Sequence, residues 1–262
     1  MRYLEEEEGF RVTYLPVDSK GRIKLDALKE ALCPETILVS IMYVNNEVGT
    51  VQPVQEAARL VKQYKPSILF HTDAVQGYGK YRIWPKRMGI DLLTASGHKI
   101  HGPKGIGFLY IDSKVKIRPI VFGGEQQKNI RSGTENVPGI AGLGLASKMI
   151  YQDLEMKTAL MRELKARFIE GISKIENTTI HGFTDDGSAP HIISVGVAGI
   201  RSEVLLHTLE DKGIYVSSGS ACSSNHPSVS GVLKGIGAAR EYLDATLRFS
   251  MSEFTTKEEI DY

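Results

Sequence analysis

Amine, carboxylate, amide and imidazole side chains follow three apolar runs of the sequence, where they could act together on one ligand. They are Asn45 and Asn46 after the run 37–44, Asp73 and Gln76 after the run 67–72, and His98 and Lys99 after the run 91–96. A lysine amine bonds covalently to an aldehyde, a carboxylate keeps a pyridine nitrogen protonated, and amides bind a ring oxygen. The set therefore indicates an aromatic nitrogen cofactor that Lys99 holds covalently.

Residue spacing disfavours other ligands. His98 and His101 are three residues apart, but no Cys, Asp or third His stands beside them to complete a zinc site. Gly105 and Gly107 lack the full spacing of a dinucleotide fingerprint, and no Walker A sequence occurs. Taken singly, an Asp at a strand end is commonly a helix cap, so the combination carries the hypothesis. The sequence therefore predicts no metal site and argues against NAD and ATP.

The apolar runs alternate with helical patterns, which predicts an α/β fold with a mostly parallel sheet. In such sheets ligands bind beyond the carboxyl ends of the strands, where the polar residues above are expected to lie. The run 37–44 is almost wholly apolar, so we expect a strand buried on both faces. A strand of unassigned direction is expected at 105–111. Alternation at Phe10, Val12 and Tyr14 predicts one more strand.

Helical periodicity is clearest in the segment 53–64, which begins with a proline. Its apolar stripe consists of Val54, Ala57, Ala58 and Val61. From 137 to 175 the pattern is helical and long. The core positions expected there are Met149, Leu154, Leu160, Leu164 and Phe168. We predict a large cofactor-binding domain at 1–152 and a smaller C-terminal α+β domain at 153–262.

Composition fits a folded, water-soluble protein, because 42% of the 262 residues are hydrophobic and 24% are charged. A net charge of +1 gives no reason to expect nucleic-acid or membrane binding. No apolar run approaches the roughly 18 residues of a membrane span, and the N-terminus resembles neither a signal nor a transit peptide. We therefore expect a cytoplasmic protein. Its two cysteines, Cys33 and Cys222, form no disulfide framework, and Cys33 is expected to be a small buried hydrophobe.

Six motifs, in order along the chain, resemble those of the cysteine desulfurases of the NifS and IscS type. These enzymes belong to the class V aminotransferase group of fold-type I pyridoxal phosphate enzymes. The motifs are Val44-Asn-Asn-Glu-Val-Gly49, His71-Thr-Asp-Ala-Val-Gln76, Ser96-Gly-His-Lys-Ile-His-Gly-Pro-Lys-Gly105, Arg131-Ser-Gly-Thr134, Ser217-Ser-Gly-Ser-Ala-Cys-Ser223 and Leu247-Arg-Phe-Ser250. The resemblance covers essentially the whole chain. It implies pyridoxal 5'-phosphate as cofactor, conversion of L-cysteine to L-alanine, and a homodimer.

The resemblance also implies which residues hold the cofactor ring. Lys99 would carry the cofactor covalently, and Asp73 would pair with the pyridine nitrogen. Asn46 and Gln76 would bind the ring oxygen. These roles agree with the chemistry that the side chains themselves indicate.

Four further residues take roles from the same resemblance. Ser96 and His98 would contact the cofactor's phosphate, and Thr134 would reach the phosphate held by the partner subunit. Arg248 would bind the substrate carboxylate, a task suited to its two parallel donors.

Cys222 matches the thiol on which these enzymes form a persulfide. Its segment is rich in Ser, Gly and Asn with few apolar anchors, so we expect a mobile loop and an accessible sulfur. A thiol that attacks in the site and then delivers sulfur to another protein needs both reactivity and a swinging tether. The acceptors that fit are iron–sulfur scaffold proteins and enzymes of tRNA thiolation. Cys222 could also ligate an iron–sulfur cluster transiently.

Two alternatives remain open. A selenocysteine lyase or another class V aminotransferase shares the sheet motifs and differs in the Cys222 loop. A noncatalytic, truncated desulfurase-like protein would only bind a scaffold or sulfur acceptor. Relative to the family pattern, the chain starts after the Thr pair that binds phosphate and the His that stacks on the ring, and it stops before the last helices. Losing two phosphate contacts predicts cofactor binding weaker by about two to four orders of magnitude.

Overall fold

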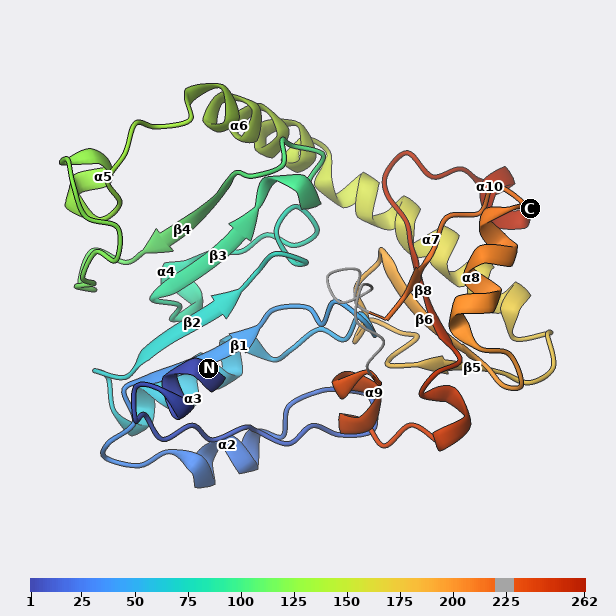
Figure 1. The fold of residues 1–262 in the computed structure, drawn as a ribbon, viewed down its shortest axis with the longest axis horizontal. Helices are drawn as coiled ribbons and strands as arrows, with labels where there is room; N and C mark the ends of the chain where they lie inside the picture. The colour runs from blue at the N-terminus through green and yellow to red at the C-terminus, as the bar shows by residue number, and fades with distance from the viewer. Residues whose placement is uncertain (220–228) are drawn as a thin grey trace.

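The computed structural model describes residues 1–219 and 229–262, and it is an α/β structure with two sheets (Figure 1). The strands are β1 (Leu38–Met42), β2 (Leu69–Asp73), β3 (Leu92–Ser96), β4 (Gly107–Ile111), β5 (Thr178–His181), β6 (Ile192–Val197), β7 (Ser217–Ser218) and β8 (Thr246–Ser250). The α-helices are α1 (Arg2–Glu6), α2 (Leu25–Ala31), α3 (Val54–Tyr64), α4 (Pro85–Met88), α5 (Gln126–Asn129), α6 (Val137–Tyr151), α7 (Leu154–Ile172), α8 (Ser202–Glu210), α9 (Gly231–Gly235) and α10 (Lys257–Asp261). Short 3-10 helices are η1 (Gly97–Lys99) and η2 (Arg240–Tyr242).

The first sheet has the order β1-β2-β3-β4. β1, β2 and β3 are parallel, as predicted, and β4 runs antiparallel to β3. We call the end at which β1, β2 and β3 finish the carboxyl edge. In Figure 1 the arrowheads of these three strands point toward the second sheet. The carboxyl edge therefore faces the C-terminal half of the chain.

One face of the first sheet is packed and the other is exposed. Phe70 and Leu93 point to the packed face, where α3 buries the predicted stripe Val54, Ala57, Ala58 and Val61. On the opposite face Leu38 is 37% and Met42 38% exposed. The prediction that 37–44 is buried on both faces is therefore wrong, because helices of the described chain pack on one side of β1 and its side chains alternate in burial.

The second sheet has the order β5-β6-β8-β7 and is antiparallel throughout. Its core contains Leu164 from α7, Ile193 and Val195 from β6, and Met251. All four strands come from the C-terminal part of the chain. The second sheet and α7 thus share a hydrophobic core that is separate from the core on the packed face of the first sheet.

The helical stretch predicted at 137–175 is two helices, α6 and α7, with Asp153 in left-handed backbone (φ 54°) between them. The proposed domain boundary, between 1–152 and 153–262, coincides with this break. Leu154 and Leu164 are buried, whereas Met149 is 56% exposed. The core prediction for Met149 is wrong because Leu143 and Ile150 occupy the packed face of α6.

Two other predictions about the first domain also fail. The segment from Phe10 to Tyr14 is not a strand, since Phe10 is 46% and Tyr14 60% exposed and alternation alone provides no partner strand. Cys33 is half-buried rather than buried, and its sulfur accepts a hydrogen bond from Arg11 Nη2 at 3.3 Å. Across residues 1–219 and 229–262, no helix combines the length and apolarity of a membrane span.

Candidate active site

The strand register places Asp73 in the middle of the carboxyl edge. Asp73 is the last residue of β2, and it pairs with Met42 of β1 on one side and Thr94 of β3 on the other. Its side chain lies on the exposed face, and Oδ1 accepts a hydrogen bond from Val75 N at 2.9 Å. This leaves carboxylate lone pairs available to a ligand at the edge.

His71 lies two residues before Asp73 on the same face of β2. Its Nδ1 is 2.7 Å from Ser40 Oγ, and its Nε2 is 3.4 Å from Thr94 Oγ1. Burial lowers the pKa of His71, and the nearby carboxylate of Asp73 opposes that shift only in part. His71 is therefore a neutral link between three strands, which fixes the surroundings of Asp73.

Lys99 lies in a tight turn at the end of β3. Within η1 the backbone N–H groups of Ile100 and Gly102 both donate to the carbonyl of Gly97, at 3.0 and 2.9 Å. A Cβ at Gly97 would lie 3.1 Å from both Ile106 Cγ2 and Pro103 O, so a larger residue would crowd the turn there. The chain then returns as β4, which holds the half-buried Lys99 on a rigid element.

Arg248 reaches the carboxyl edge from the second sheet. It lies on β8, paired with Ser194 of β6 and Ser217 of β7. Its Nη1 donates to the carbonyl oxygen of Asn46 at 2.9 Å, and Nη2 donates to Ser217 Oγ at 3.3 Å. The structure thus brings Arg248 and Asn46, 202 positions apart in sequence, into direct contact.

Gln76 makes another contact between the halves. Its Oε1 lies 3.1 Å from Nε2 of His191, the buried residue that precedes β6. Burial, reinforced by the positive charges of Lys80, Lys165, Arg248 and Lys99, lowers the pKa of His191 well below its usual value. The imidazole is therefore neutral. His191 was not predicted from the sequence, and its only signal there is a polar residue at the start of the apolar run 192–197.

Lys165 of α7 holds the segment around His191. Its amine, 6% exposed, donates to Ser188 Oγ at 2.6 Å, Ala189 O at 2.8 Å and Ile192 O at 2.6 Å. Burial and the neighbouring Arg162 lower the pKa of Lys165 to about 8. At neutral pH all three N–H bonds of the ammonium group therefore have acceptors. This residue was also missed, since a lysine in an amphipathic helix is usually solvated.

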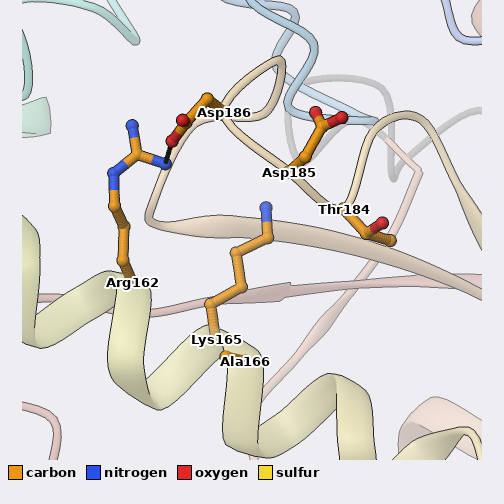
Figure 2. Close-up of a pocket in the computed structure, with 6 residues that line it drawn as sticks. All are labelled: Arg162, Lys165, Ala166, Thr184, Asp185 and Asp186. Carbon is orange, nitrogen blue, oxygen red and sulfur yellow. Dashed lines mark ion pairs between the residues drawn. The ribbon is translucent and has the colours of Figure 1, made fainter.

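A pocket of about 260 Å³ lies beside the Lys165 side chain and is separate from the carboxyl edge. It is lined by Arg162, Lys165, Ala166, Thr184, Asp185 and Asp186. Figure 2 shows Lys165 rising from α7, with Arg162 paired to Asp186 at 3.3 Å. None of the residues predicted for the cofactor lines this pocket. The ion pair between Arg162 and Asp186 neutralises part of the charge of its lining.

The remaining predicted residues differ in their placement. Ser96, half-buried, ends β3 next to the Lys99 turn, and His98 is exposed within that turn. Thr134 is exposed on the loop between α5 and α6, and α5 lies beyond the other end of the first sheet (Figure 1). Among the described residues, no hydrogen bond joins Thr134 to Lys99. Cys222 lies outside the described residues. In the ranges 1–219 and 229–262 no group of three or more His, Cys, Asp or Glu is placed to hold a metal ion.

Comparison with known proteins identifies the class to which this two-sheet arrangement belongs. The chain is a member of the aminotransferase class-V family, which matches residues 1–262. It is 44% identical over 256 residues to the cysteine desulfurase IscS of Methanosarcina thermophila, covering 98% of this chain and 63% of that protein.

Solved structures show the same fold. The structure of a NifS-like protein superimposes with a TM-score of 0.92 at 38% identity, over 100% of this chain and 68% of the other. The structure of SspA in complex with cysteine superimposes with a TM-score of 0.78 at 32% identity, over 96% of this chain and 69% of the other. The mixed α/β fold with a mostly parallel sheet is thus confirmed, while the chain spans about two thirds of these relatives.

The contacts of Lys165 predict a large loss of stability in Lys165→Met. The variant leaves the Ala189 and Ile192 carbonyls without their donor, which should lower the free energy of unfolding by about 2 to 3 kcal/mol. Urea unfolding measures this value. Lys174→Met is the matched control, because Lys174 is an exposed partner of Glu170 and should change stability by less than about 0.5 kcal/mol. Equal losses in the two variants would contradict the structure.

The lowered pKa of Lys165 also predicts a pH dependence. Between about pH 8 and the usual value of 10.5, the folded protein has released a proton that the unfolded chain retains. Since the unfolded state then binds more protons, this group makes stability rise with pH, by up to about 1.4 kcal/mol per unit. The stability difference between wild type and Lys165→Met should therefore be larger at about pH 9.5 than at about pH 7.5. A constant or smaller difference would show that Lys165 titrates normally.

Proposed function

We propose that this chain carries the active site of a pyridoxal phosphate-dependent cysteine desulfurase. The reaction converts L-cysteine to L-alanine and leaves the sulfur as a persulfide on Cys222. The observation that carries the proposal is the meeting, at one sheet edge, of Asp73, the Lys99 turn and Arg248 from the second sheet. The names of the relatives support it, as does the similarity to SspA, whose structure was solved in complex with cysteine.

The side chains at the carboxyl edge fit the chemistry of pyridoxal phosphate. Asp73 offers a carboxylate to the pyridine nitrogen, and Asn46 and Gln76 offer amides to the ring oxygen. The Lys99 amine matches the aldehyde. Because the Gln76 oxygen already faces a donor on His191, its N–H groups remain for a ligand oxygen. Each of these side chains thus matches one polar group of the cofactor.

The phosphate would bind near the start of η1. Ser96 supplies a hydroxyl and His98 an imidazole, and Thr134 would serve the site of a second copy. Exposed apolar side chains in the segment 120–145, which contains Thr134, support a homodimer, since burying them would stabilise association. They include Ile120 (89% exposed), Phe122 (80%), Val137 (65%) and Leu145 (60%).

When bound, pyridoxal phosphate supplies an aldehyde that links to amines and a ring that draws electrons from the α-carbon. Asp73 keeps the pyridine nitrogen protonated, which makes that withdrawal effective. Arg248 orients the substrate by its carboxylate through two parallel N–H donors. Lys99 would hold the cofactor through its amine and, as a free amine, would act as the base for the α-proton of the substrate. Its rigid turn keeps the amine within reach throughout.

The Cys222 thiolate performs the sulfur step. It attacks the sulfur of the bound cysteine, so that a sulfur–sulfur bond forms while the carbon–sulfur bond breaks. The electron pair stays with the carbon, which is protonated to give alanine. The persulfide is then passed to an acceptor, for which an iron–sulfur scaffold protein or a tRNA-thiolation enzyme is suitable. This assignment rests on the Ser217–Ser223 motif rather than on placement.

Lys99→Ala should abolish the visible absorbance band of lysine-linked pyridoxal phosphate, because the variant removes the amine that the η1 turn holds at the carboxyl edge. The measurement is an absorbance scan with excess pyridoxal phosphate. Lys104→Ala is the matched control, since Lys104 is an exposed lysine of the same glycine-rich loop and should keep the band. A band that persists in Lys99→Ala would move the attachment to another lysine. No band in wild type would favour a protein that only binds partners.

Cys222→Ser should lose alanine and sulfide production from L-cysteine by at least about 100-fold while keeping the absorbance band, because the cofactor does not need the thiol. Cys33→Ser is the control, because Cys33 precedes the start of β1, away from the carboxyl edge, and the variant should keep full turnover. Normal turnover in Cys222→Ser would contradict the assignment. Turnover of selenocysteine but not cysteine by wild type would identify a selenocysteine lyase instead.

A further inference from the structure

His191 and Gln76 form a buried contact that crosses between the two sheets. His191 is 7% exposed, and its Nε2 lies 3.1 Å from Gln76 Oε1. An amide oxygen only accepts hydrogen bonds, so the proton between them belongs to His191. His191, just before β6 of the second sheet, therefore donates a hydrogen bond to the amide oxygen of Gln76 beside the carboxyl edge.

The imidazole can donate only in this direction. Burial comes first among the causes that lower the pKa of His191, followed by Lys80, Lys165, Arg248 and Lys99. A neutral imidazole has a single N–H, and here it is on Nε2. Nδ1 is buried without a hydrogen-bond partner among the described residues. A proton on Nδ1 would therefore have no acceptor, which favours an unprotonated Nδ1. The tautomer of His191 is thus set by its surroundings.

The backbone on both sides of the ring is also fixed. Met251 N donates to the carbonyl of His191 at 3.0 Å. Lys165 holds the carbonyls of Ala189 and Ile192 at 2.8 and 2.6 Å. The ring therefore has little freedom to turn away from Gln76.

A glutamine amide presents its oxygen or its nitrogen in almost the same space, and only the partner decides between them. With His191 donating to Oε1, both remaining N–H donors of Gln76 are left for a ligand. We propose that His191 is a positioning residue, which fixes the Gln76 amide with its nitrogen toward the site so that the edge binds an oxygen anion. Given the proposed function, on which this inference rests, that anion is the ring oxygen of pyridoxal phosphate.

The test is a double-mutant cycle on pyridoxal phosphate affinity, with wild type, His191→Phe, Gln76→Ala and the double variant. His191→Phe keeps a ring but removes the donor, and it should weaken binding by about 5- to 10-fold. In the Gln76→Ala background the same change should have almost no further effect. His191→Gln places an N–H near the position of Nε2 and should restore most of the affinity. If His191→Phe weakens binding equally in both backgrounds, the ring acts on the fold alone and the proposal is wrong.

A second measurement needs no cofactor. Nitrogen NMR spectra of the apo protein should show His191 as the neutral Nε2–H tautomer at pH 6.5, where an ordinary imidazole is half protonated. A protonated ring, or the Nδ1–H tautomer, would overturn the proposal. A wild type without the visible cofactor band would instead contradict the proposed function, and the spectra would still decide the role of His191.

Discussion

The buried ammonium group of Lys165 holds the segment through which the second sheet contacts the first. It joins α7, the helix that packs against the second sheet, to the segment 188–192. That segment pairs with the chain after β1, where Ala189 N donates to Gly49 O at 2.8 Å and Val51 N donates to Gly187 O at 2.9 Å. A charged group with every donor satisfied tolerates little displacement, since each lost bond leaves a buried polar atom. The fixed position of this segment also limits how far the other residues that contact the first sheet can move.

Two of those contacts bear on the site. Arg248 and His191 both stand on the second sheet, and both touch residues that follow strands of the first, Asn46 and Gln76. Asp73 and Lys99, which are proposed to hold the cofactor ring, by contrast end or follow strands of the first sheet. The positive charges of Lys99, from the first sheet, and Arg248, from the second, both act on His191 and help to lower its pKa. A positive region at the junction suits a ligand that carries phosphate and carboxylate groups.

The sequence predicts well what depends on local periodicity and poorly what depends on distant partners. The stripe of α3 is buried as predicted, because an amphipathic helix records its own packed face. The alternation from Phe10 to Tyr14 lacks a neighbouring strand, and the apolar run of β1 does not reveal that one face stays exposed. Asp73 and Lys99 could be predicted to lie at one edge because the carboxyl ends of parallel strands converge there. His191 was missed because its partner is 115 positions away.

The guanidinium of Arg248 donates a hydrogen bond to the main-chain oxygen of Asn46. A carbonyl is present whatever amino acid occupies the position. This bond between the halves therefore places no constraint on the side chain at position 46, which is constrained instead by its proposed contact with the cofactor ring. The other end has no such tolerance, because no other amino acid offers a planar cation with several fixed donors. Evolutionary constraint on a single hydrogen bond is thus unequal at its two ends.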